Sequence, residues 1–285
     1  MKNYLDINRN HPCFSPGAAP KQARIHLPVA KRCNISCNYC NRKYDCLNES
    51  RPGVASEIIS PREGLERFQH YRKHLPHLSV VGIAGPGDAL ADWEESRQTM
   101  SLIRQYDPRV ILCLSTNGLK LPKLAAGILA LEVSHVTVTV NTLNPETGAK
   151  IYRYVNYEGK RYYDREGARI LLENQLSGIR FLTQNGVIVK INTVMIPGIN
   201  DQEIPDLVRQ MKELGVYISN IMPLIPVPGS LFENMNPTDP RELSMMRHSC
   251  QNDLRQMFHC QQCRADAVGL LNSRPGCAKA GQQAG

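Results

Sequence analysis

Three cysteines within eight residues constrain this chain more than any other feature of its sequence. Cys33, Cys37 and Cys40 form a C-x3-C-x2-C run directly after a short apolar stretch. Three thiolates on one tight loop can bind three irons of a 4Fe-4S cluster and leave the fourth iron without a protein ligand. A structural zinc site usually adds a second ligand pair, and core cysteines do not cluster in this way. The spacing therefore favours an iron-sulfur cluster with one iron open to a small molecule.

Short β-rich stretches alternate with amphipathic helical stretches along most of the chain, which indicates a parallel sheet with right-handed crossovers. The expected strands cover residues 24–30, 79–84, 109–114, 133–140, 187–194 and 217–222. The expected helices begin after a capping box at Ser60 and then cover residues 94–105, 122–131, 168–185 and a segment capped by Asp201. The pattern predicts an α/β fold, a partial (βα)6 TIM-like barrel.

The expected barrel occupies residues 24–235 and has an extension at each end. Residues 1–23 form an arm that its prolines keep from being helical. Residues 236–285 are expected to add a helix and a cluster-binding segment. Residues 144–166 are rich in tyrosine and charge, so we expect an irregular surface excursion there.

The composition excludes several classes of protein. With 285 residues, 42% of them hydrophobic, the chain can bury a large core. The N-terminus lacks the apolar run of a signal peptide, and no stretch of about 18 apolar residues suggests a membrane span. We therefore expect a cytoplasmic protein without a membrane partner, in which ten cysteines indicate metal or redox chemistry. The net charge of +8 is dispersed and only 6% of residues are aromatic, so we expect no nucleic-acid partner.

The cysteine run, with Tyr39 just before its last member, resembles the signature of the radical S-adenosylmethionine (SAM) enzymes. The resemblance implies that the amino and carboxylate groups of SAM chelate the open iron. It further implies that an electron from the cluster cleaves SAM into methionine and a 5'-deoxyadenosyl radical. The partial barrel is also the fold that this resemblance implies.

Several expected strands end in polar residues or glycines, and a barrel carries its chemistry at the carboxyl ends of its strands. Residues 85–88 read Gly-Pro-Gly-Asp, where the family usually has Gly-Gly-Glu. Short polar side chains suit contacts with a ribose or a carboxylate, and glycines allow close backbone approach. The residues expected at the SAM site are Tyr39, Gly85, Ser115, Asn117, Asn192 and Met222.

Other candidate ligands lie outside the first cysteine run. Cys113 shares a strand face with Ser115 by the two-residue period. Barrel layers draw inward side chains from alternate strands, so His26 on the first strand could meet Cys113 on the third. A lone histidine is more often a satisfied core residue, and spacing alone leaves its role open. Cys260 and Cys263 form a second C-x2-C pair, which a structural zinc site would also explain.

Residues 11–15, 33–54 and 260–269 resemble, more narrowly, the radical SAM enzymes that assemble the nitrogenase cofactor. The resemblance implies that two further 4Fe-4S clusters are substrates, fused around a carbide from the SAM methyl group and completed by a sulfide to an 8Fe-9S-C precursor. It implies a cluster donor protein, a low-potential electron donor and cofactor carrier or scaffold proteins as partners. The implied ligands are Cys13, His26 and Cys113 for the first substrate cluster, and Cys46, Cys260 and Cys263 for the second.

Two alternatives remain open at this stage. The C-terminal pair and Cys277 form C-x2-C-x13-C, which resembles the C-terminal cluster of the GTP-cyclising radical SAM enzyme of molybdopterin synthesis. That enzyme has no use for Cys13, Cys46 and Cys113. A non-enzymatic iron-sulfur carrier would explain the cysteines, but not a barrel with polar residues at its strand ends. Neither the main interpretation nor the alternatives assign Cys250.

Overall fold

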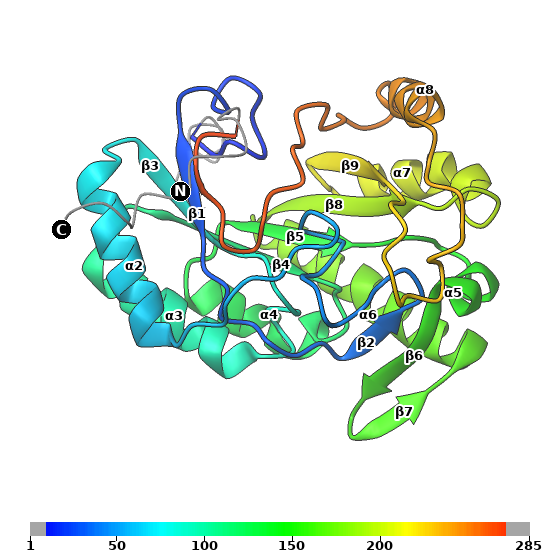
Figure 1. Cartoon of the computed structure of the whole chain (residues 1–285), viewed down its shortest axis with the longest axis horizontal. Helices are drawn as coiled ribbons and strands as arrows, with labels where there is room; N and C mark the ends of the chain where they lie inside the picture. Colours follow the sequence, from blue (N-terminus) through cyan, green and yellow to red (C-terminus); the bar gives the residue numbers. More distant parts are fainter. Residues whose placement is uncertain (1–9, 272–285) are drawn as a thin grey trace.

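The computed structural model describes residues 10–271 and contains a curled, mainly parallel sheet with helices along one face (Figure 1). The strands of this sheet stand in the order β10-β1-β3-β4-β5-β8-β9. Its strands are β1 Ala23–His26, β3 Leu78–Ile83, β4 Ile111–Thr116, β5 His135–Thr139, β8 Ile188–Met195, β9 Ile218–Pro223 and β10 Val268–Gly269. All neighbouring strands run parallel except β10, which pairs antiparallel with β1. The predicted partial barrel is confirmed.

Helices follow the strands and bury apolar residues against the outer face of the sheet. They are α2 Pro61–His74, α3 Trp93–Tyr106, α4 Leu121–Ala130, α6 Asp164–Gln184, α7 Ile204–Glu213 and α8 Pro240–Cys250. The two faces of the strands divide the core: Leu112 and Leu114 of β4 join the large cluster beneath the helices, whereas Cys113 belongs to a separate cluster with Val80 and Phe14. Cys250, which the sequence left unassigned, is buried in the large cluster. Within residues 10–271, no helix is long and apolar enough to cross a bilayer.

The prediction of an irregular excursion at residues 144–166 is wrong. This stretch holds the helix α5 Pro145–Ile151 and a hairpin of β6 Tyr152–Tyr157 and β7 Lys160–Tyr162. Asn144 caps α5 by accepting a hydrogen bond from the Glu146 N–H. The hairpin is completed by β2 Ile35–Cys37, so the second sheet has the order β2-β6-β7. Local composition did not reveal this structure because its third strand comes from a segment about a hundred residues away in the chain.

Two further expectations need correction. The strand predicted over residues 24–30 ends at His26, because Pro28 cannot donate to a sheet ladder; beyond it, Ala30 makes only an isolated bridge to Pro86. Asp201 does not cap an α-helix: it begins the short 3-10 helix Asp201–Glu203, and α7 begins three residues later. Its carboxylate instead accepts the Gly198 N–H and holds the preceding turn.

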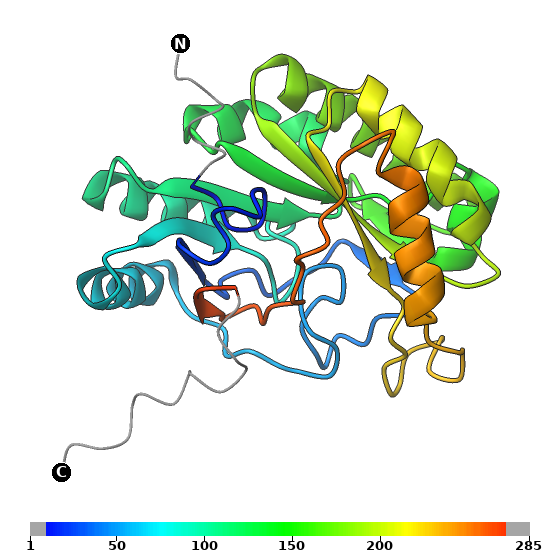
Figure 2. The ribbon, with the colours of Figure 1, turned by 90° about the horizontal axis from the view of Figure 1, so that it is seen from above.

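The two ends of the described chain meet across the open side of the sheet. The arm from residue 10 and the segment leading to β10 lie side by side in both views (Figure 1, Figure 2). The His26 N–H donates to the Ala267 carbonyl, and the His259 ring contacts the Pro12 carbonyl. Residues near both ends of the chain therefore lie over the same face of the sheet. Cys277 lies outside the described residues.

A substitution at Gly178 tests the packing of α6 against α4. A Cβ on Gly178 would lie 2.2 Å from the Leu121 Cβ, so Gly178→Ala must force the two helices apart. We expect a loss of about 1–3 kcal/mol in the free energy of unfolding, as for other overpacked cores. Urea unfolding measures it, with Ser177→Ala at the exposed neighbouring position as control. Equal stability of the two variants would contradict the tight α4–α6 contact.

Candidate active site

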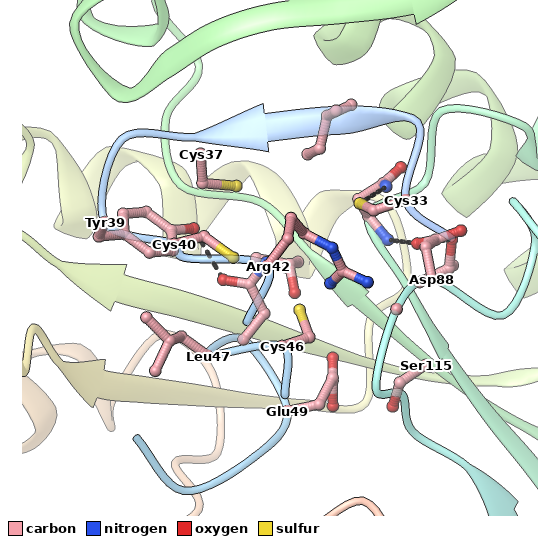
Figure 3. A pocket seen from close by; sticks show the side chains of 16 residues that line it. Cys33, Cys37, Tyr39, Cys40, Arg42, Cys46, Leu47, Glu49, Asp88 and Ser115 are labelled. Carbon is pink, nitrogen blue, oxygen red and sulfur yellow. Dashed lines mark hydrogen bonds between the residues drawn. The ribbon is translucent and has the colours of Figure 1, made fainter. Parts of the chain in front are cut away.

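The cysteine loop lines a cavity of about 450 Å³ on the concave side of the sheet (Figure 3). The Cys33, Cys37 and Cys40 side chains all face it, as does Cys46. Among the described residues, no three His, Cys, Asp or Glu side chains converge on a point that could hold a single metal ion. The three thiols are instead spaced around the cavity, an arrangement that fits a cluster with several irons.

Backbone pairing and a buried tyrosine hold the cysteine loop. Cys37 is paired with Tyr152 of the hairpin, and the Cys40 N–H donates to the Cys37 carbonyl. Tyr39 is 1% exposed; its hydroxyl donates to the Asn48 side chain and accepts from Asn141 at the end of β5. The sequence placed Tyr39 at the SAM site. The structure puts it at the cavity wall with its hydroxyl already engaged by two partners.

The segment after β3 clamps the loop to the end of β4. The Asp88 carboxylate is buried and accepts four hydrogen bonds, two from the N–H groups of Leu90 and Ala91 and two from the Thr116 hydroxyl and the Asn117 N–H. Gly87 is required because a Cβ there would lie 2.1 Å from the Arg32 carbonyl oxygen, directly before the first cysteine. Both Gly87 and Asp88 line the first cavity.

The hydrogen bond from the Asn117 N–H to the Asp88 carboxylate holds Asn117 where its side chain points toward Cys33. Its side-chain amide donates to the Asn34 side chain at 2.6 Å and lies 3.7 Å from the Cys33 sulfur. Ser115 of β4, two residues before Asn117, also lines the cavity. These two SAM-site predictions lie where a ligand in the first cavity could be contacted, whereas Gly85 lines neither this cavity nor the second one described below.

A second cavity of about 630 Å³ adjoins the first and collects cysteines from distant segments. Ser115 and Glu49 line both cavities, so the two share a wall. Asn192 and Met222, which the sequence placed at the SAM site, line only the second cavity. The ligand-type residues that line it are Cys13, His26, Cys113, Cys260 and Cys263.

These ligand-type side chains come from four separate parts of the chain: the N-terminal arm, β1, β4 and the segment before β10. Cys113 projects from the middle of β4, and His26 ends β1 with its Nδ1 atom 3.2 Å from the Arg264 carbonyl oxygen. Cys260 accepts a hydrogen bond from Asn220 of β9. The structure thus brings His26 and Cys113 to one cavity, as the barrel-layer argument predicted. Cys46 is placed apart from Cys260 and the other ligand-type residues of the second cavity, because it faces the first one.

Burial controls the charge of these groups in the protein without bound clusters. Burial raises the pKa of Cys33 to about 12 and that of Cys13 to about 11. It lowers the pKa of His26 to about 4, so the imidazole is neutral near pH 7. Binding iron therefore requires the thiols to release protons, whereas the histidine can bind iron as it stands.

Glu49 is a site residue that sequence analysis missed. Its backbone follows the turn begun by Cys46, and its carboxylate accepts a hydrogen bond of 3.3 Å from the Asn192 amide. The other carboxylate oxygen has no hydrogen-bond partner among the described residues. Burial raises the pKa of Glu49 to about 7, although Lys190 opposes this shift. The sequence offered only its position three residues after Cys46 as a signal.

Three basic residues at the second cavity were also missed. Lys190 is the one charged residue in the apolar strand β8, and Arg24 is buried in β1. The Arg24 guanidinium donates to the Cys263 sulfur at 2.9 Å. His11 is 2% exposed and lines the cavity. A charged residue inside a buried strand was the available signal for Lys190 and Arg24, since such residues are rarely buried without a partner.

The sequence profile of the Radical SAM superfamily matches residues 27–211, a stretch that includes the cysteine loop and most of the barrel. The chain belongs to the radical SAM superfamily. Membership implies a 4Fe-4S cluster and SAM as cofactors. The predicted enzyme class, a radical SAM enzyme, and the predicted fold are therefore both confirmed.

Relatives within the radical SAM superfamily are more specific. The chain is 45% identical over 263 residues to the FeMo cofactor biosynthesis protein NifB of Chlorobaculum tepidum and 49% identical over 265 residues to the protein of that name from Klebsiella pneumoniae. These matches cover 92% of this chain but only 62% and 57% of those relatives. The resemblance to radical SAM proteins of nitrogenase cofactor assembly is confirmed, and the chain spans less than two thirds of the curated relatives it matches.

Solved radical SAM structures share the fold at low identity. SuiB of Streptococcus suis bound to S-adenosylmethionine superposes with a TM-score of 0.57 at 14% identity, covering 80% of this chain and 47% of that one. Methylornithine synthase (PylB) gives a TM-score of 0.50 at 12% identity, over 96% and 82% of the two chains. These likenesses support the radical SAM barrel.

The raised pKa of Glu49 predicts a pH-dependent stability for the chain without clusters. Below pH 4.5, the ordinary value, the carboxyl is protonated in both folded and unfolded chains. Between there and about pH 7 only the unfolded chain ionises, so the stability associated with this group is lost as the pH rises. Glu49→Gln should therefore gain stability relative to the wild type between pH 5 and pH 8.

Urea unfolding at the two pH values measures this difference. Glu57→Gln, at an exposed position, serves as the matched control and should follow the wild type at both pH values. A stability difference between Glu49→Gln and the wild type that stays constant with pH would show that Glu49 ionises as freely in the folded chain as in the unfolded one.

Proposed function

We propose that this radical SAM enzyme assembles a nitrogenase cofactor precursor, fusing two 4Fe-4S substrates around a carbide from a SAM methyl group and adding a sulfide to give an 8Fe-9S-C product. The observation that carries the proposal is the second cavity, where five ligand-type side chains from four segments adjoin the cavity of the radical SAM cysteines. The NifB relatives, named for FeMo cofactor biosynthesis, support it.

The ligand sets proposed for the substrates divide between the cavities. Cys13, His26 and Cys113 would bind the first substrate cluster within the second cavity. The second substrate cluster would lie at the junction of the two cavities, because Cys46 faces one side and the pair Cys260 and Cys263 faces the other. With three protein ligands each, both clusters keep an exposed iron. Three clusters and SAM are then the full proposed set.

The residues of the first cavity would prepare SAM for cleavage. The three loop cysteines would hold a 4Fe-4S cluster, which when reduced would supply the electron for SAM cleavage. Asn117 and Ser115 offer polar contacts in this cavity, and Ser115 lies on the wall shared with the second. Asp88 does not face SAM as a free carboxylate, since its oxygens hold the ends of β3 and β4 in place. It therefore acts as a positioning residue.

Glu49 is placed to move protons between the two sites. Converting a methyl group to a carbide requires the loss of its hydrogens, some of them as protons. A carboxylate with a pKa of about 7 that lines both cavities can accept a proton near neutral pH. One of its oxygens accepts no hydrogen bond among the described residues and is therefore available for this step.

His26 would make the first substrate cluster easier to release. A neutral imidazole is a weaker ligand for iron-sulfur clusters than a thiolate. Because burial keeps His26 neutral, the imidazole can bind iron without first losing a proton.

The partners proposed for loading and release are a cluster donor, a low-potential electron donor and nitrogenase cofactor carrier proteins, in the cytoplasm. The charge of +8 would favour acidic partners.

Counting iron after anaerobic reconstitution tests the proposal. The wild type should hold about twelve irons per chain and a Cys33, Cys37, Cys40 triple alanine variant about eight, since each site holds four. The triple variant should also form no 5'-deoxyadenosine. A drop from about eight to about four irons would leave one auxiliary cluster and favour the GTP-cyclising alternative. Wild-type protein that binds clusters but does not cleave SAM would instead indicate a carrier.

A single substitution tests the role of His26. His26→Ala should keep the SAM-cleaving cluster and lose the first substrate cluster, up to about four irons per chain. Iron analysis and 5'-deoxyadenosine formation distinguish the two losses. His70→Ala, on the exposed side of α2, is the control. Unchanged iron content together with unchanged product yield in His26→Ala would remove His26 from the ligand set.

A further inference from the structure

Lys190 places a positive charge inside the second cavity. It lies within β8, is 7% exposed and lines the cavity. Its ammonium group stands 5.5 Å from the centre of the Phe14 ring. Among residues 10–271, no carboxylate lies within ion-pair distance of this ammonium. A buried ammonium without a paired counter-ion is unfavourable. Acidic groups around the cavity, Cys13 and Glu49 among them, act on Lys190 without forming an ion pair, so its ammonium is open to an anion in the cavity.

The surroundings of Lys190 keep it charged. Burial by itself lowers the pKa of Lys190, but acidic groups around the cavity, Cys13 and Glu49 foremost, raise it above the ordinary value. The backbone of Lys190 pairs with Thr137 of β5, which also lines the cavity. The charge is thus carried on a rigid strand and not on a loop.

His11 adds a hydrogen-bond donor beside this charge. The Cys13 N–H donates to its Nδ1 atom at 3.1 Å, so in the neutral ring the proton is on Nε2. The Nε2 atom is buried and has no hydrogen-bond partner among the described residues. Its ring packs 4.5 Å from that of Phe14, the same ring that Lys190 approaches.

The other donors at this cavity are directed at ligand sulfurs. Arg24 donates to the Cys263 sulfur and the Gly269 carbonyl, and Asn220 donates to the Cys260 sulfur. Lys190 and His11 make no such contact with a cysteine sulfur among the described residues. Their donors are therefore available to an occupant of the cavity.

We propose that Lys190 and His11 form an anion-recognition wall of the second cavity, which binds the bridging sulfides of the iron-sulfur substrate whose irons bind Cys13, His26 and Cys113. The inference rests on the proposed function. Bridging sulfides carry negative charge, and hydrogen bonds to them shift the reduction potential of a cluster. The wall would hold the cluster by its sulfides while the protein ligands hold its irons. Lys190 and His11 are then positioning residues for the substrate.

Charge-removing substitutions at Lys190 test the wall. The background is the Cys33, Cys37, Cys40 triple alanine variant, in which the remaining clusters are those outside the radical SAM loop. In that background Lys190→Met, which is neutral and of similar length, should lower the midpoint potential of the cluster bound by Cys13, His26 and Cys113. The potential falls because a nearby positive charge, which favours the reduced cluster, is removed. Chelator-driven iron release should become about tenfold faster, as expected for loss of one charge-assisted hydrogen bond. Lys190→Arg should keep the parent potential, because it keeps the charge.

Two further comparisons separate the wall from a general effect of substitution. Lys212→Met removes an exposed lysine of α7 and should change neither potential nor release rate. His11→Phe removes the donor at similar size and should shift the potential in the same direction as Lys190→Met, whereas His11→Gln keeps a donor and should not. Electron paramagnetic resonance during redox titration measures the potentials, and circular dichroism confirms that each variant folds.

The outcomes distinguish this inference from the proposed function. Parent-like potential and iron release in both Lys190→Met and His11→Phe would overturn the wall while leaving the cluster site in place. A triple alanine background that binds no iron would overturn the proposed substrate clusters, and the wall with them. Equal shifts in Lys190→Met and Lys212→Met would also overturn the wall, because the effect would then not depend on the cavity.

Discussion

The pairing of β2 with β6 is the interaction on which the active site depends. It converts the start of the cysteine loop into a strand, so that Cys37 is held by a backbone ladder and not by a free loop. The buried Tyr39 hydroxyl then ties the loop to Asn48 and Asn141. A catalytic group must be held within fractions of an ångström by its surroundings. The hairpin that supplies β6 is thus part of the site, although it lies outside the main barrel sheet.

The second cavity shows how the two ends of the described chain contribute to one site. The arm brings Cys13 and the C-terminal segment brings Cys260 and Cys263 to a wall whose other members, His26 and Cys113, come from barrel strands. The His259 ring contacts the Pro12 carbonyl and joins the two segments, and the Arg51 N–H, from the loop after Cys46, donates to the Cys263 carbonyl. The barrel supplies a rigid concave surface, and the extensions complete it.

Electrostatics divides the groups around this cavity into two kinds. Burial favours neutral thiols and neutral imidazoles. The cations Arg24 and Lys190 persist in the same region despite their burial. Arg24 is paired with a ligand sulfur, whereas Lys190 faces the open cavity. The second cavity therefore holds a cation that no ligand-type sulfur engages, beside one that is engaged.

The sequence alone determined the fold and the first cysteine site, because both are encoded locally. The strand-helix alternation and the spacing of Cys33, Cys37 and Cys40 need no knowledge of distant contacts. The tertiary structure decided what depends on long-range approach: the pairing of β2 with the hairpin, the position of Glu49 between two cavities and the separation of Cys46 from Cys260. The sequence shows Lys190 only as the single charged residue of an apolar strand. The folding of distant segments around β8 places that charge in a cavity lined by cysteines.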